Sequence, residues 1–254
     1  MFVLLVTSLI LCSSYGYAQE ELLLSAFNIQ VFGQTKVSKP EVVQVLIQIL
    51  ARYDLIVVQE IRDIQETAFP ELISQLNQVS DLYDHFMGIR VGRTASKEQY
   101  GFVYKRDKLS KIGEFQFNDT SDAFEREPLI VRFRWSAGID FTLIPMHAKP
   151  SDAVNEMNAL IQVYEESTSI YGNDSIILGD LNADCSYVCQ SCWSGVQLRS
   201  ESAFHWLIAD DVDTTVSNSN CAYDRLIVTG DLLSKVCCAD VFRFDTHFNL
   251  TQDE

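Results

Sequence analysis

Three mostly apolar runs in this chain each end on side chains that can bind a cation or move a proton. The runs and the residues that follow them are 175–178 before Asp180 and Asn182, 54–59 before Glu60, and 141–146 before His147. Open α/β sheets carry their chemistry at the carboxyl ends of strands, and a carboxylate beside an amide suits a divalent cation and a phosphate. We therefore expect one active site built from three strand ends, although single strands often end in polar residues that only face solvent.

Local patterns predict that strands alternate with helices early in the chain and pair as hairpins later. Apolar residues after Pro40 recur at helical spacing, and Ser38 with Glu41 forms a capping-box pattern at the start of that helix. The expected strands are 22–28, 54–60, 100–105, 131–135, 141–146 and 175–180, with short buried runs at 204–208 and 226–228. Further helices are expected at 69–79 and from 150 to about 166. This order predicts an α/β (α+β) fold, a four-layer sandwich of two packed β-sheets flanked by helices.

Residues 1–18 have the pattern of a secretory signal peptide. The apolar run 2–12 is shorter than the roughly 18 residues that cross a bilayer, and the small residues Gly16 and Ala18 fit a cleavage site before Gln19. A short membrane anchor is the alternative. No linker or repeat divides the remainder, so we expect residues 19–254 to form one domain. The expected protein is secreted through the endoplasmic reticulum and has no stable membrane association.

The cysteines favour an oxidising compartment. Those that remain after the predicted cleavage are Cys185, Cys189, Cys192, Cys221, Cys237 and Cys238. An even number in a secreted chain indicates disulfides, and the Cys-Gln-Ser-Cys spacing, which zinc sites also use, has no second spaced pair beside it. Spacing does not choose among the possible pairings. The triplets that begin at Asn118, Asn173 and Asn249 are candidate N-glycosylation sites.

The net charge of −16 disfavours tight electrostatic capture of a polyanion. A typical nucleic-acid-binding domain presents a basic face. A bound cation reverses the local field of a carboxylate site. Any binding to DNA is therefore expected to be weak and dependent on cations.

A series of ordered blocks spans about 22–244. They are Ala26-Phe27-Asn28-Ile29, Val58-Gln59-Glu60-Ile61-Arg62-Asp63, Ser96-Lys97-Glu98-Gln99-Tyr100, Arg126-Glu127-Pro128, the run 147–153, the run 179–185 and the run 220–225. Together they resemble the secreted deoxyribonuclease I family of the endonuclease/exonuclease/phosphatase fold. The resemblance implies a monomeric, divalent-metal-dependent endonuclease that hydrolyses DNA to 5′-phosphorylated oligonucleotides, with catalytic Mg²⁺ and structural Ca²⁺.

The resemblance also implies roles for single residues. Glu60 would hold Mg²⁺ together with Asn28, and Asp180 and Asn182 would lie around the scissile phosphate. His147 would exchange a proton with the reacting oxygens, while Glu98 would orient its ring. The residues implied for DNA contacts are Arg62, Arg93, Arg126 and Tyr223; those implied for the calcium loop are Asp213 and Thr215; and the implied disulfide joins Cys185 and Cys221.

Three departures from the family pattern reduce the expected activity. Gln30 replaces a usual arginine and Ser96 a usual tyrosine, and both changes should weaken the hold on DNA. The family's closing Ser-Asp-His segment is absent, so Asp224 would lack the histidine that it orients, and the last core strand would be missing. A truncated form of a working nuclease, a catalytically impaired binding protein and an active variant with a replacement group all fit this pattern.

Two rival functions stay open beside DNA hydrolysis. The resemblance implies that an inactive family member can still bind proteins such as monomeric actin. A phosphodiesterase acting on lipid or nucleotide headgroups is the alternative within the fold. Activity on duplex DNA that depends on metal and on His147 would separate the nuclease from both.

Overall fold

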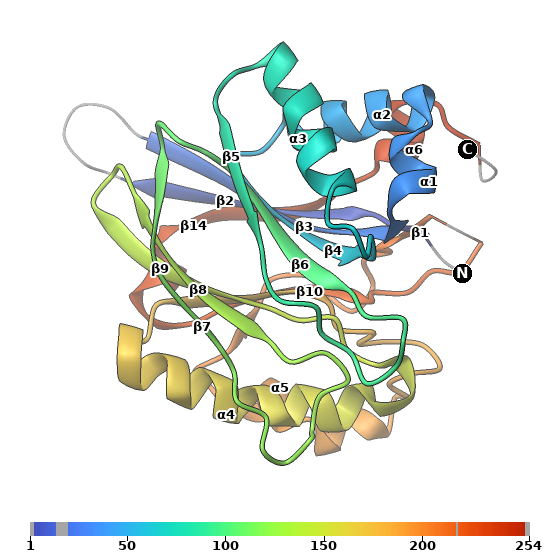
Figure 1. The fold of residues 1–254 in the computed structure, drawn as a ribbon. Coiled ribbons are helices and arrows are strands. Elements are labelled where there is room, and N and C mark those ends of the chain that lie inside the picture. The colour runs from blue at the N-terminus through green and yellow to red at the C-terminus, as the bar shows by residue number, and fades with distance from the viewer. Residues whose placement is uncertain (1–2, 14–19, 217, 252–254) are drawn as a thin grey trace.

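The computed structural model describes residues 3–13, 20–216 and 218–251. Two six-stranded β-sheets pack face to face, and helices cover the outer face of each (Figure 1). The first sheet has the order β14 (Val236–Phe242), β2 (Val6–Ser13), β3 (Glu20–Phe32), β4 (Leu55–Ile61), β6 (Gln99–Lys105) and β5 (Tyr83–Met87). The second has the order β11 (His205–Trp206), β13 (Asp224–Val228), β10 (Ser175–Asp180), β9 (Ile139–Pro145), β8 (Leu129–Trp135) and β7 (Leu109–Gln116). The predicted sandwich of two sheets between helices is confirmed.

Alternation along the strands explains the layers. In β4, Leu55 and Val57 face the core between the sheets, whereas Ile56 and Val58 face the helices. This two-residue period is what a strand that is buried on both faces requires. Strands β3 and β4 run parallel, as do β9 and β10. Their carboxyl ends, which carry the predicted site residues, therefore point the same way within each pair.

Helices α1 (Gln34–Val37), α2 (Pro40–Leu50), α3 (Ala68–Val79) and α6 (Phe244–His247) cover the first sheet. Helix α4 (Ala153–Tyr171) and the short α5 (Gln197–Ser200) cover the second sheet. The helices predicted at 38–50, 69–79 and 150–166 are confirmed, although α4 continues five residues beyond 166, to Tyr171. The capping box was wrong. Ser38 ends α1 and donates its hydroxyl to the Thr35 carbonyl, so Lys39 is the residue that precedes α2.

The apolar N-terminal run forms a core strand in the described chain. Strand β2 pairs antiparallel with β3 on one side and with β14 on the other. Its Leu9 and Leu11 are fully buried between the sheets. In the described chain β2 therefore covers the edge of β3. Removal of residues 1–18 as a signal peptide stays a prediction, and the proposed cleavage site lies outside the described residues.

Three disulfides connect cysteines in the described chain. They join Cys12 to Cys237, Cys185 to Cys221, and Cys189 to Cys192. Cys238 is free and exposed. Cys12 was expected to leave with the signal peptide, and its bond to Cys237 instead links β2 to β14. Among the helices that the structure describes, none is long and apolar enough to cross a membrane.

Candidate active site

Six of the predicted residues meet where the strand ends of the two sheets face each other. Asn28 and Glu60 come from β3 and β4, and Glu98 comes directly before β6. From the second sheet, His147 follows β9, while Asp180 and Asn182 lie at the end of β10 and just beyond it. The six residues are between 1% and 7% exposed. The site therefore exists only when both sheets are docked.

Two carboxylates converge on the Asn28 amide. Its Nδ2 lies 3.1 Å from Glu60 Oε1 and 3.2 Å from Asp180 Oδ2. The other Glu60 oxygen accepts the Val31 amide at 2.9 Å. Burial raises the pKa of the Asp180 carboxyl, and the nearby charge of Glu60 raises it further. Two carboxylates of low exposure that converge on one amide are suitable ligands for a divalent cation.

His147 and Glu98 form a tight pair beside these carboxylates. His147 Nδ1 lies 2.5 Å from Glu98 Oε1, and its Nε2 lies 3.6 Å from Asp180 Oδ2. Burial alone lowers the pKa of His147, but the charge and hydrogen bond of Glu98 outweigh it and raise that pKa above the ordinary value. Because the Glu98 carboxylate accepts a hydrogen bond from Nδ1–H, Nε2 is the ring atom available for proton transfer.

Gln59 and Tyr100 position the catalytic groups. Gln59 is fully buried; its Nε2 donates to the Met146 carbonyl at 2.6 Å, and its Oε1 accepts the Asp180 amide at 3.0 Å. The Tyr100 hydroxyl accepts the His147 amide at 3.0 Å. Sequence reasoning assigned neither residue a role. A polar side chain inside the apolar run 54–59 was the available sign, because a buried amide has to find partners.

The backbone at the site adopts uncommon conformations. Glu60 has φ 63° and Asn182 has φ 48°, in the left-handed region that costs about 1–3 kcal/mol for such residues. Gly179 has φ 126°, and a Cβ there would lie 2.5 Å from the Met146 carbonyl oxygen. Only glycine fits that position. The turn that presents Asp180 is therefore fixed by its neighbours.

Asp224 lies opposite Asp180 in the β10–β13 register. It is fully buried, and within the described chain neither of its carboxyl oxygens has a hydrogen-bond partner. Burial and the charge of Asp180 raise the pKa of Asp224 well above its ordinary value. The role expected for Asp224 stays a prediction.

The predicted DNA contacts occupy different surroundings. Arg62 lies 3.0 Å from Glu60 and 3.5 Å from Glu98, and Arg126 lies 2.9 Å from Glu98, so both border the cluster. Arg93 lies further out, paired with Asp122.

Tyr223 precedes β13 and is 4% exposed. Its ring packs against Tyr187 at 5.2 Å between centroids. A side chain buried in this way offers little surface to DNA.

The predicted calcium loop is already hydrogen-bonded. Asp213 Oδ1 accepts the Thr215 hydroxyl at 2.8 Å, and Oδ2 pairs with Arg243 at 3.1 Å. Both carboxyl oxygens of Asp213 therefore have protein partners, and the calcium role stays a prediction. Among the described residues, one group of three His, Cys, Asp or Glu ligand atoms lies within 4.8 Å, namely Asp184, Cys185 and Cys221. Since both sulfurs are in a disulfide, that group is no metal site.

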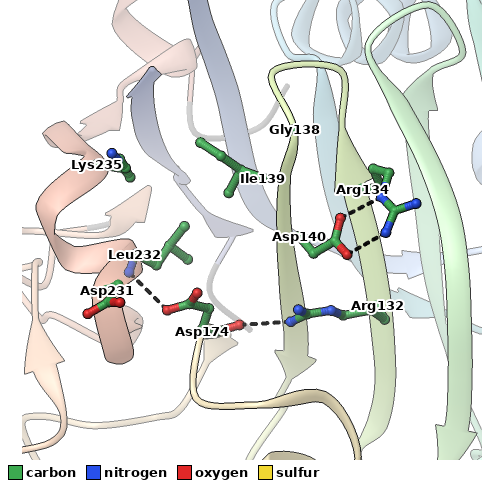
Figure 2. Close-up of a pocket in the computed structure, with 9 residues that line it drawn as sticks. All are labelled: Arg132, Arg134, Gly138, Ile139, Asp140, Asp174, Asp231, Leu232 and Lys235. Carbon is green, nitrogen blue, oxygen red and sulfur yellow. Dashed lines mark hydrogen bonds and ion pairs between the residues drawn. The ribbon is translucent and has the colours of Figure 1, made fainter. Parts of the chain in front are cut away.

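A cavity of about 490 Å³ is lined by residues that include Arg134, Asp140 and Asp174 (Figure 2), and none of the six catalytic residues is among them. Asp174, which comes directly before β10, lines it, whereas Asp180 ends the same strand. Arg134 and Asp140 in its wall pair through two contacts of 2.7 Å each. This cavity and the catalytic groups are therefore at opposite ends of β10.

Comparison with known proteins identifies the family and agrees with the fold. The profile of the Endonuclease/Exonuclease/phosphatase family matches residues 25–239. Human Deoxyribonuclease-1 is 41% identical over 240 residues, which cover 90% of this chain and 85% of that protein. The chain belongs to the deoxyribonuclease I family. Mouse Deoxyribonuclease-1-like 2, which is 43% identical over 238 residues, covers 91% of this chain and 86% of its own length in the match.

Solved structures with low sequence identity share the fold. The human Nocturnin catalytic domain superposes with a TM-score of 0.58 at 13% identity and covers 80% of each chain. A mannosyl-6-phosphatase from Bacteroides thetaiotaomicron gives a TM-score of 0.56 at 16% identity, over 82% of this chain and 85% of that one. The deoxyribonuclease I family thus shares its two-sheet fold with phosphatases, so the particular residues at the site decide the reaction.

Proposed function

We propose that this chain is a secreted, divalent-metal-dependent endonuclease that hydrolyses phosphodiester bonds of DNA to 5′-phosphorylated oligonucleotides. The observation that carries the proposal is the buried His147–Glu98 pair beside Glu60 and Asp180. Relatives named as deoxyribonucleases that are about 40% identical over most of the chain support DNA as the substrate.

The side chains divide the chemistry between proton transfer and charge. His147 would take or give a proton at Nε2, and Glu98 would hold the ring and favour the imidazolium form. Arg62 and Arg126 border the site and would bind phosphate oxygens as cations. Asn28 and Asn182 would donate amide protons to the same group, since neither carries a charge that repels it.

The cluster fits a hard divalent cation. Glu60 and Asp180 are carboxylates of low exposure that converge on one amide, and Mg²⁺ is usually bound by one or two carboxylates together with substrate phosphate. Glu60 would hold the ion, with Asp180 and Asn28 close to it. When bound, the ion would stabilise negative charge on the phosphate.

The three disulfides support secretion through an oxidising compartment, because such bonds rarely persist in the cytosol. The unpartnered carboxyl oxygens of Asp224 support slower hydrolysis than in a family member whose corresponding aspartate orients a histidine. The calcium role of Asp213 and Thr215, actin binding and the monomeric state stay predictions.

Nicking of supercoiled DNA in Mg²⁺ tests the proposal. His147→Ala should lower the rate by about 10²–10⁴, and a chelator should abolish it. His205→Ala is the matched control, since His205 is exposed on β11. Nicking that survives both chelation and loss of His147 would rule out the proposed nuclease. Cleavage of phospholipid headgroups without DNA cleavage would favour the rival phosphodiesterase.

A further inference from the structure

One buried carboxylate outside the catalytic cluster ties two catalytic loops to a helix. Glu156 lies in the first turn of α4 and is fully buried. Its Oε1 accepts the backbone amide of Glu125 at 3.0 Å, and its Oε2 accepts that of Lys149 at 3.3 Å. One side chain thus holds two loops that lie 24 residues apart in the sequence.

Both loops lead directly to the catalytic pair. Arg126 follows Glu125, and its Nε lies 2.9 Å from Glu98 Oε1. His147 precedes Lys149 by two residues and binds the same Glu98 oxygen at 2.5 Å. Arg126 Nη1 also donates to the His147 carbonyl at 3.4 Å. A shift of either anchored amide would therefore move a group that contacts Glu98.

We propose that Glu156 is a positioning residue whose ionised carboxylate holds Arg126 and His147 against Glu98, and whose protonation releases one of the two loops. The ionised group can accept both amides at once. The neutral acid turns one oxygen into a donor, which cannot accept an N–H in the same geometry. The proposal rests on the proposed function for its effect on hydrolysis, but the loop anchoring can be measured without it.

The surroundings of Glu156 place its protonation in the neutral pH range. Burial raises the pKa of Glu156 to about 7, and the two backbone amides and the charge of Arg126 only partly oppose it. The other titratable and charged groups that face it are Asp152 on the preceding turn, Glu125 and Lys149 at the anchored amides, Arg93, and Tyr100. We thus expect the Glu156 carboxylate to hold both backbone amides above pH 7 and to release one of them below pH 7.

The direct test follows the amide resonances of Glu125 and Lys149 by nuclear magnetic resonance as the pH is varied in the full chain. We expect both resonances to shift with a midpoint near pH 7. In Glu156→Gln the shift should be absent, because a carboxamide imitates the protonated acid at every pH. Glu165→Gln, on the exposed side of the same helix, should titrate as the unmodified chain does.

DNA hydrolysis gives the second measurement. Glu156→Gln should lower kcat by roughly 10-fold to 10²-fold at pH 8, with a smaller change in KM, and should flatten the rise of kcat around neutral pH. The inference would be overturned if the Glu125 and Lys149 amide resonances did not shift with pH in the unmodified chain, or if they shifted equally in Glu156→Gln. If these resonances shift with pH but the chain does not hydrolyse DNA, the anchoring of the two loops by Glu156 would be supported and the proposed nuclease refuted. The titration of the unmodified chain needs no variant, so it stays decisive if Glu156→Gln does not fold.

Discussion

At the scale of residues, the acid–base properties of the site depend on Glu98. It contacts His147 at 2.5 Å and Arg126 at 2.9 Å, and it is 1% exposed. Burial alone would raise the pKa of Glu98, but His147 and the arginines lower it. Glu98 is therefore ionised through the neutral range, where it sustains the raised pKa of His147.

Replacing this carboxylate should shift the pH dependence of hydrolysis. In Glu98→Gln the charge that raises the pKa of His147 is gone, so that pKa falls. A base that loses its proton at lower pH moves the acidic limb of the kcat profile to lower pH, and looser orientation lowers the maximum by about 10–10². Glu114→Gln, on an exposed part of β7, is the control for kinetics between pH 5 and 9. An unchanged acidic limb would contradict a role for Glu98 in setting this pKa.

The sequence predicted several of these residues as members of the site and did not predict others. Asn28, Glu60, His147, Asp180 and Asn182 follow apolar runs, and the strand ends of the two sheets come together. Gln59 and Glu156 act on partners that are far away in the sequence. No local pattern shows which distant amide a buried polar group will reach. The arginine that pairs with Asp213 also comes from a different part of the chain, so no local pattern shows this pair.

At the scale of elements, Gln59 joins β4 of one sheet to the ends of β9 and β10 in the other. Gln59→Leu would keep the volume while leaving the Met146 carbonyl and the Asp180 amide without this partner. Each buried unsatisfied group costs about 1–3 kcal/mol, so the free energy of unfolding should fall by about 2–5 kcal/mol. Urea denaturation measures the change.

An exposed glutamine provides the comparison for that experiment. Gln44→Leu on the outer face of α2 should change the free energy of unfolding by less than about 0.5 kcal/mol. Equal effects of the two substitutions would show that the Gln59 bonds contribute nothing.

Element prediction succeeded where one periodicity dominated and was ambiguous where two structures share one composition. The apolar run 2–12 fits a signal peptide, and it fits a buried strand equally well because both are short, uncharged and rich in branched residues. In the described chain the run pairs as β2 with β3 and β14, and the Cys12–Cys237 bond joins positions 225 residues apart. These contacts do not test whether residues 1–18 are cleaved, so the signal peptide stays a prediction. Ser38 likewise has the right spacing for a cap, yet it ends the preceding helix.

At the scale of the whole molecule, β2 contributes to the core between the sheets. A chain that begins at Gln19 would lose the fully buried Leu9 and Leu11, each of which stabilises by about 1.5–3 kcal/mol. It would also expose the edges of β3 and β14. We expect a lower urea midpoint and more self-association than in the full chain, measured by fluorescence and light scattering.

The disulfide can be separated from the strand in the same experiment. Cys12→Ser in the full chain removes the bond to Cys237 but keeps β2. If this variant resembles the full chain and the Gln19 chain does not, the strand provides the stability. Equal midpoints for all three proteins would show that β2 adds nothing to the fold.

The division of the catalytic groups between two sheets has a practical outcome. Glu60 and Asn28 belong to one sheet, and His147 and Asp180 to the other. Gln59 connects the two sheets by hydrogen bonds. A displacement of one sheet relative to the other by a few ångströms would inactivate the enzyme while leaving the secondary structure of each sheet intact. Heat inactivation should accordingly begin below the temperature at which far-ultraviolet circular dichroism changes. The rate of DNA hydrolysis would then be a more sensitive measure of how the two sheets are docked than the circular dichroism signal.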